Sequence, residues 1–240
     1  MTMTLKTFCA ATGIETVPVG VYDVPESVRV TPVTPLNRCI FDHYQDFQAG
    51  VSVVLSQTSQ GCPGCGYWML GKGRFPNKEA MVIFLTDKEG LRANSRLMEA
   101  WLDAHPTFPP QNGNILVGPV RDELSGYLQA VTFFVNPDQL GVLNYAAHYH
   151  SHPNDAEPVL APFGSGCGLI FSLFPDRSIP QAMIGATDIA MRQHLPPDIL
   201  TFTVTIPMLD RLLSLDDGHS FLDKPFLNGL KLARAQEKQH

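Results

Sequence analysis

The sequence lacks both a long apolar run and a cluster of basic residues. Its longest apolar stretches, at residues 130–135 and 169–174, are far too short to span a bilayer. The 17 Lys and Arg residues are scattered, apart from a group at residues 231–238, and the formal net charge is −6. Proteins that bind nucleic acid usually carry a basic patch. We therefore expect a protein that binds neither membranes nor nucleic acids.

A secretion signal is also missing. Residues 1–14 contain no continuous apolar stretch, and their basic residue, Lys6, is isolated. We therefore expect a cytoplasmic protein. The sequence has 5 cysteines with irregular spacing. In a reducing compartment such a set favours free thiols, a metal site or a redox pair over a disulfide framework.

The composition is that of a globular chain with many turns. Of 240 residues, 44% are hydrophobic and 17% are charged, and there are 20 prolines and 19 glycines. Candidate strands and helices are interspersed, with no repeat and no low-complexity linker, which predicts an α/β or α+β fold. We expect one globular domain over residues 1–240, with a mixed sheet, flanking helices and a C-terminal helix at 222–238.

Local patterns predict the individual elements. Helices are expected at residues 4–11, 37–48, 77–86, 95–104, 137–149, 187–193 and 207–214. Strands are expected at residues 17–22, 51–55, 115–120, 128–135, 182–185 and 199–206. Residues 165–174 form either an apolar helix or a buried strand, since their periodicity does not decide between the two.

A glycine-rich stretch at residues 61–66 contains Cys62 and Cys65 in a C-x-x-C spacing. We expect it to form a tight turn from which two sulfurs can bind one metal or cluster, or form a dithiol redox pair. Cys167 lies in a second glycine-rich turn, and Cys39 begins a candidate helix. These two thiols would complete the site. The alternative is that the cysteines are small buried hydrophobic residues, which is our interpretation of Cys9.

Three histidines alternate with other residues at His148, His150 and His152. The segment from the second of them resembles the core of the JAMM/MPN metalloprotease motif. The serine and aspartate positions of that motif fall on Leu160 and Phe163, so we reject the match. The histidines can either chelate a divalent metal or form the polar end of a helix.

Asp188 and Arg192 are four residues apart on a candidate helix. They can form an ordinary surface ion pair. Alternatively, Arg192 faces the ligand site and binds a carboxylate. The glycine-rich residues 164–168 do not match the dinucleotide-binding fingerprint.

Several stretches, taken in order, carry a resemblance to a known family. They are residues 17–21, 38–39, 62–66 with 70–71, 134–140, 166–168 and 185–192. Together they resemble the domain of unknown function 169 family of bacterial and archaeal proteins, from about residue 5 to about residue 213. The resemblance implies that Cys39, Cys62 and Cys167 occupy the family's cysteine positions. The position of Cys65 is often a small residue in relatives, and the three histidines lie outside the pattern.

These observations lead to one main hypothesis and two alternatives. The main one is an iron–sulfur cluster, most plausibly [4Fe–4S], held by Cys39, Cys62, Cys65 and Cys167, with a redox or small-molecule role. Asp188 and Arg192 would then contact the substrate. A zinc site on the same thiols is the first alternative.

The second alternative is a non-catalytic module that binds a small apolar or anionic ligand between Tyr67, Trp68 and Phe163. The expected partners are a small molecule or a redox partner protein, and the chain can form a homo-oligomer.

Overall fold

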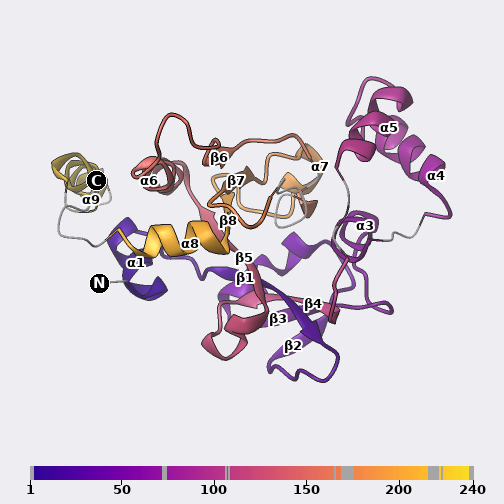
Figure 1. Ribbon diagram of the computed structural model, residues 1–240, viewed down its shortest axis with the longest axis horizontal. Helices are drawn as coiled ribbons and strands as arrows, with labels where there is room; N and C mark the ends of the chain where they lie inside the picture. The colour runs from indigo at the N-terminus through magenta and orange to yellow at the C-terminus, as the bar shows by residue number, and fades with distance from the viewer. Residues whose placement is uncertain are drawn as a thin grey trace.

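The computed structural model describes residues 3–71, 75–105, 107, 109–164, 166–168, 176–215, 222 and 224–237. Its centre is an open eight-stranded sheet with the strand order β2-β3-β4-β1-β5-β8-β7-β6 (Figure 1). The strands are β1 Val19–Pro25, β2 Val33–Pro35, β3 Ser52–Leu55, β4 Gly113–Pro119, β5 Leu128–Val135, β6 Val159–Leu160, β7 Ala182–Gly185 and β8 Leu200–Thr205.

The sheet is mixed. The pairs from β3 to β7 are antiparallel, and the two edge strands β2 and β6 each pair in parallel with their neighbour. Helices flank the sheet, so the expected mixed α+β architecture is confirmed. The two edge strands were not expected, because segments of three and two residues are too short to show a pattern.

The α-helices are α1 Leu5–Thr12, α2 Tyr44–Gln48, α3 Pro63–Leu70, α4 Lys78–Ile83, α5 Ser95–Ala104, α6 Pro137–His148, α7 Ile189–Arg192, α8 Ile206–Leu213 and α9 Pro225–Glu237. Shorter helical turns are η1 Ile40–His43, η2 Phe84–Lys88, which is π-helical, and η3 Asp122–Tyr127. No helix in the described ranges is both long and apolar enough to cross a membrane.

The alternation of strand β5 divides the core in two. Side chains point to opposite faces at successive positions, so Ala130 and Phe134 pack on one face of the sheet and Val131 and Phe133 on the other. The first core lies under α3, α4, α5 and the η1–α2 segment. The second lies under α1, α6, α8 and α9, at the other end of the molecule in Figure 1.

Local signals explain where the helices begin. Helix α6 starts with a capping box, in which Asn136 and Gln139 exchange side-chain-to-backbone hydrogen bonds, and Pro137 occupies its first turn. Helix α7 is capped by Asp188, whose carboxylate accepts the amide of Ala190 at 3.0 Å. The helix predicted over residues 187–193 therefore begins only after Asp188. The expected helix or strand at residues 165–174 lies outside the described residues, except for 166–168.

Candidate metal centre

Three cysteines from two distant segments lie together beside the first core. The sulfurs of Cys62, Cys65 and Cys167 are all within 4.8 Å of one another. Cys62 Sγ lies 3.5 Å from Cys65 Sγ. Cys65 and Cys167 are buried, and Cys62 is partly buried. Three soft sulfur donors gathered in this way can bind a metal.

Helix α3 presents the first two of these thiols. Cys62 is its N-cap, with its sulfur accepting the amide of Cys65 at 3.5 Å, and Pro63 occupies the first helical position. The expectation of a tight turn followed by a separate apolar segment is therefore wrong, since one helix runs to Leu70. A proline at the first position and a side-chain acceptor before it favour a helix start. One turn of helix then places Cys65 beside Cys62.

Cys167 comes from the short turn at residues 166–168, which is packed tightly. A Cβ atom on Gly166 would lie 2.7 Å from both Met191 Cγ and Phe41 Cε2, so only glycine fits there. The amide of Gly166 donates to the carboxylate of Asp188 at 3.1 Å, which ties the turn to α7. These contacts fix the turn between α7 and the sheet side of the core.

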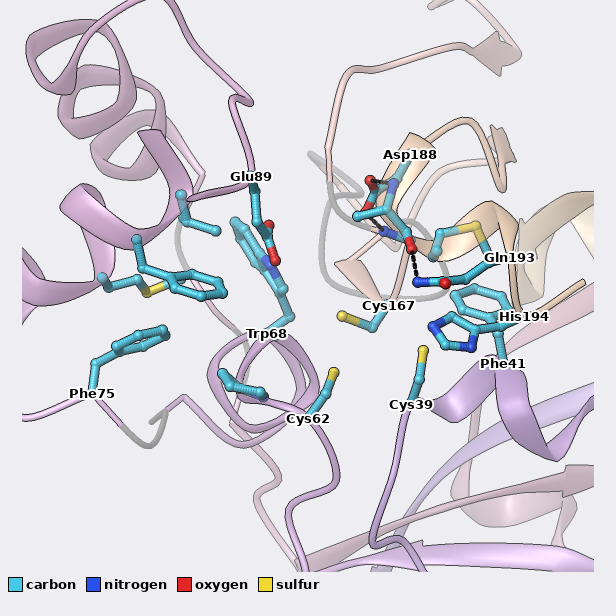
Figure 2. A pocket seen from close by; sticks show the side chains of 18 residues that line it. Cys39, Phe41, Cys62, Trp68, Phe75, Glu89, Cys167, Asp188, Gln193 and His194 are labelled. Carbon is cyan, nitrogen blue, oxygen red and sulfur yellow. Dashed lines mark hydrogen bonds between the residues drawn. The ribbon is translucent and has the colours of Figure 1, made fainter. Parts of the chain in front are cut away.

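Cys39 completes the rim of the group from a third segment. It immediately precedes η1 and is partly buried, whereas we had placed it inside a helix over residues 37–48. It is not a member of the set within 4.8 Å, but its thiol hydrogen-bonds to Cys62. Figure 2 shows the sulfurs of Cys39, Cys62 and Cys167 directed toward one common space.

The thiols of this group perturb one another. Hydrogen bonds from Cys167, Cys39 and Cys65, in that order, hold the pKa of Cys62 well below its usual value. The bond to Cys62 raises the pKa of Cys39, and the bond to Cys167 raises the pKa of Cys65. The lowered pKa favours the thiolate form of Cys62, at the N-terminus of α3, where a negative charge is stabilised.

Cys9 provides a contrast. It is buried in the second core on α1, and burial raises the pKa of its thiol to about 11. Among the cysteines that the structure describes, Cys9 lies outside the group and does not line the cavity in front of it.

A cavity of about 260 Å³ opens in front of the sulfurs (Figure 2). Cys39, Cys62 and Cys167 lie on one side of it. Its lining includes the rings of Phe41, Trp68, Phe75 and Phe84 and the polar side chains of Glu89, Asp188 and His194. Figure 2 shows Glu89 on the same side as Trp68, with Asp188, His194 and Phe41 across from them. The expected aromatic wall is found only in part, since neither Tyr67 nor Phe163 lines the cavity.

One protein family matches most of this chain. The model of the DUF169 family, described as "Uncharacterised ArCR", matches residues 7–214. The chain belongs to the DUF169 family. The match takes in the sheet, the cysteine group and helices α1 to α8, and it leaves α9 outside. No curated protein and no solved structure matches the chain.

In this DUF169 chain, Asp188 and Arg192 have different surroundings. Asp188 lines the cavity. Arg192 is not among the lining residues, and its guanidinium donates to the backbone carbonyls of Ala186, Pro196, Pro197 and Ile199. The contact of Asp188 with a substrate stays a prediction that its place supports. For Arg192, the described contacts indicate a role in fixing the loop after α7.

The three histidines lie at the far end of α6, away from the cysteine group. His148 pairs with Glu157 at 3.0 Å and with the carbonyl of Asn144 at 2.8 Å. His152 Nδ1 accepts the amide of Asn154. Among the described residues, the histidines do not form part of a group that can hold a metal.

One polar pair beside the cavity was not anticipated from the sequence. His194 Nδ1 lies 2.7 Å from a carboxylate oxygen of Asp42, which orients the ring at the edge of the cavity. The two residues are 152 positions apart. No sequence pattern at such a separation could have indicated the pair.

Proposed function

We propose that this protein binds an iron–sulfur cluster, of the [4Fe–4S] type, through Cys39, Cys62, Cys65 and Cys167. The observation that carries the proposal is that the sulfurs of Cys62, Cys65 and Cys167 lie within 4.8 Å of one another, with Cys39 directed toward the same space from a third segment. Cysteine thiolates are the usual ligands of such clusters. The neighbouring cavity provides room that a single ion would not require.

The surroundings of the thiols also suit a cluster. Because Gly64 has no side chain, the space beside two of the sulfurs is not filled. A Cβ atom there would lie 3.1 Å from Cys167 Sγ and 3.8 Å from Cys62 Sγ. Buried apolar residues around the group limit the access of water, which is one of the factors that set a cluster's potential. When bound, the cluster would supply one-electron chemistry, either to a redox partner protein or to a small molecule in the cavity.

A zinc site is the second candidate, and one distance favours it. A tetrahedral zinc ion with Zn–S bonds of about 2.3 Å holds its sulfurs about 3.8 Å apart. The 3.5 Å between Cys62 Sγ and Cys65 Sγ is close to that value. Zinc on these thiols would be colourless and without redox chemistry, so the two candidates are easily distinguished.

The test is metal analysis of protein purified without oxygen. The cluster predicts a brown preparation with broad absorption in the blue, and iron and labile sulfide in equal amounts. Replacement of Cys62 by serine should remove both. The matched control is Cys9→Ser, a buried cysteine outside the group, which should keep them. Colourless protein with one zinc per chain would overturn the cluster in favour of zinc, and protein with neither metal would overturn both.

A further inference from the structure

The cavity in front of the cysteine group is lined by both aromatic rings and carboxylates. On one side lie the ring of Trp68 on α3 and the rings of Phe75 and Phe84. Figure 2 shows Trp68 and Phe75 on one side of the space, with Asp188 and His194 across from them. A flat or compact apolar body fits such an aromatic wall, because rings offer large contact area and stack on one another.

The charged groups around this cavity are acidic. Glu89 and Asp188 both line it, and none of the lining residues that the structure describes is a lysine or an arginine. The two carboxylates lie close enough to interact: burial raises the pKa of Glu89, and the charges of Asp188 and then Cys62 raise it further, although much of Glu89 remains exposed.

Two described arginines in neighbouring segments are engaged by other groups. The guanidinium of Arg92 stacks over the rings of Phe163, at 3.8 Å, and Trp101, at 5.3 Å. That of Arg192 is held by backbone carbonyls. The amide of Gly166, which might otherwise bind an anion, already donates to Asp188. A ligand with a negative group would therefore meet two carboxylates with no lysine or arginine among the described lining residues to offset them, which is costly in a partly buried site.

From this lining we infer that the cavity binds a small organic cation, an amine or amidine with one aromatic ring or a comparable apolar body. The ring lies against Trp68 and Phe84, and the charged nitrogen lies between Glu89 and Asp188. A cation near an aromatic face gains further stabilisation from the ring. The volume of about 260 Å³ limits the ligand to roughly one ring with a short substituent.

This site deepens the proposed function, and its position beside a metal rests on that function. Binding itself depends only on the cavity and its carboxylates. The preference for a cation rests on Glu89 and Asp188 and is expected with or without a metal. The two ideas can therefore fail separately.

The test is calorimetric titration of the anaerobically purified full chain with three probes of one shape. They are benzylamine, which is cationic, benzyl alcohol, which is neutral, and benzoate, which is anionic. We expect benzylamine to bind with a dissociation constant on the order of millimolar, as its size allows. Benzoate should bind at least about tenfold more weakly, since it places like charges together.

Two substitutions locate the charged nitrogen. Glu89→Gln and Asp188→Asn should each weaken benzylamine binding by about fivefold, the upper range for a partly exposed ion pair. Asparagine remains a good helix N-cap, so α7 is retained. The matched control is Asp87→Asn, an exposed acid of η2 that does not line the cavity, and it should change nothing.

The outcomes separate the two proposals. If the protein is purified without metal, still binds benzylamine more tightly than benzoate, and loses affinity for benzylamine in Glu89→Gln, the cation site is supported. That result contradicts only the metal centre. Metal-loaded protein that binds benzoate as tightly as benzylamine overturns the cation site and leaves the metal centre standing. Equal binding by wild-type and Glu89→Gln protein would also overturn it.

Discussion

Gly166 offers the sharpest test of how the cysteine turn is packed. An alanine methyl there would lie 2.7 Å from Met191 Cγ and from Phe41 Cε2. Both neighbours are buried, at 5% and 1% exposure, so neither can move aside freely. The turn, the start of α7 or the ring of Phe41 must shift to make room.

The expected cost follows from similar overpacking in other cores. Extra methyl groups in a packed interior destabilise a protein by about 1–3 kcal/mol. For a chain of this size each kcal/mol lowers Tm by about 2–4 °C, so Gly166→Ala should melt about 2–12 °C lower. The shift displaces Cys167, the next residue, so the variant should also retain less metal than wild-type protein.

Gly141 provides a control of opposite sign. It lies exposed in α6, and a Cβ atom there would meet nothing within 4 Å. Alanine is favoured over glycine inside a helix by about 1 kcal/mol, so Gly141→Ala should raise Tm slightly. Differential scanning calorimetry measures both variants. The reasoning is refuted if Gly166→Ala melts at or above the wild-type temperature with its metal content intact.

Three further predictions concern single groups. In metal-free protein at neutral pH, iodoacetamide should label Cys62 faster than Cys9, because the neighbouring thiols lower the pKa of Cys62 and burial raises that of Cys9 to about 11; mass spectrometry of the labelled peptides measures both rates. Burial raises the pKa of Tyr22 from 10.0 to about 12, so the folded state keeps a proton that the unfolded state loses. Stability should therefore fall as pH rises from about 10 to 12, by at most about 2.7 kcal/mol, and urea titration should show a smaller fall in Tyr22→Phe. Asp23 accepts two backbone amides of the loop before β4, at 2.8 and 3.0 Å, so Asp23→Ala should cost about 1–3 kcal/mol in urea denaturation, whereas Asp23→Asn, which keeps one acceptor oxygen, should cost less.

The elements with strong local patterns were predictable from the sequence. Strand β5 and helix α5 occupy the expected residues 128–135 and 95–104, because alternation in one and an apolar face in the other leave little choice. Helix α3 was missed because glycine and proline around Cys62 favour a turn on composition alone. A proline at the first helical position instead favours the start of a helix. Only the position of the N-cap residue, Cys62, distinguishes a helix start from a turn here.

The site could be predicted only in part, for the same reason. The pairing of Cys62 with Cys65 is local, and their C-x-x-C spacing predicts it. The approach of Cys167 depends on how a turn 102 residues later packs against α7, which the sequence does not encode in any short pattern. The acidic lining of the cavity could not be predicted from the sequence either, because Glu89 and Asp188 come from separate elements. The sequence allowed an anionic ligand, and the lining favours a cationic one.

The central claim is that the sulfurs of this cysteine group hold a metal. X-ray absorption spectroscopy at the edge of whichever metal copurifies, on anaerobically prepared protein, measures the ligand shell directly. The account predicts a shell of sulfur at about 2.3 Å from the metal. A shell of nitrogen or oxygen at about 2.0–2.1 Å with no sulfur, or protein that binds no metal at all, would contradict it.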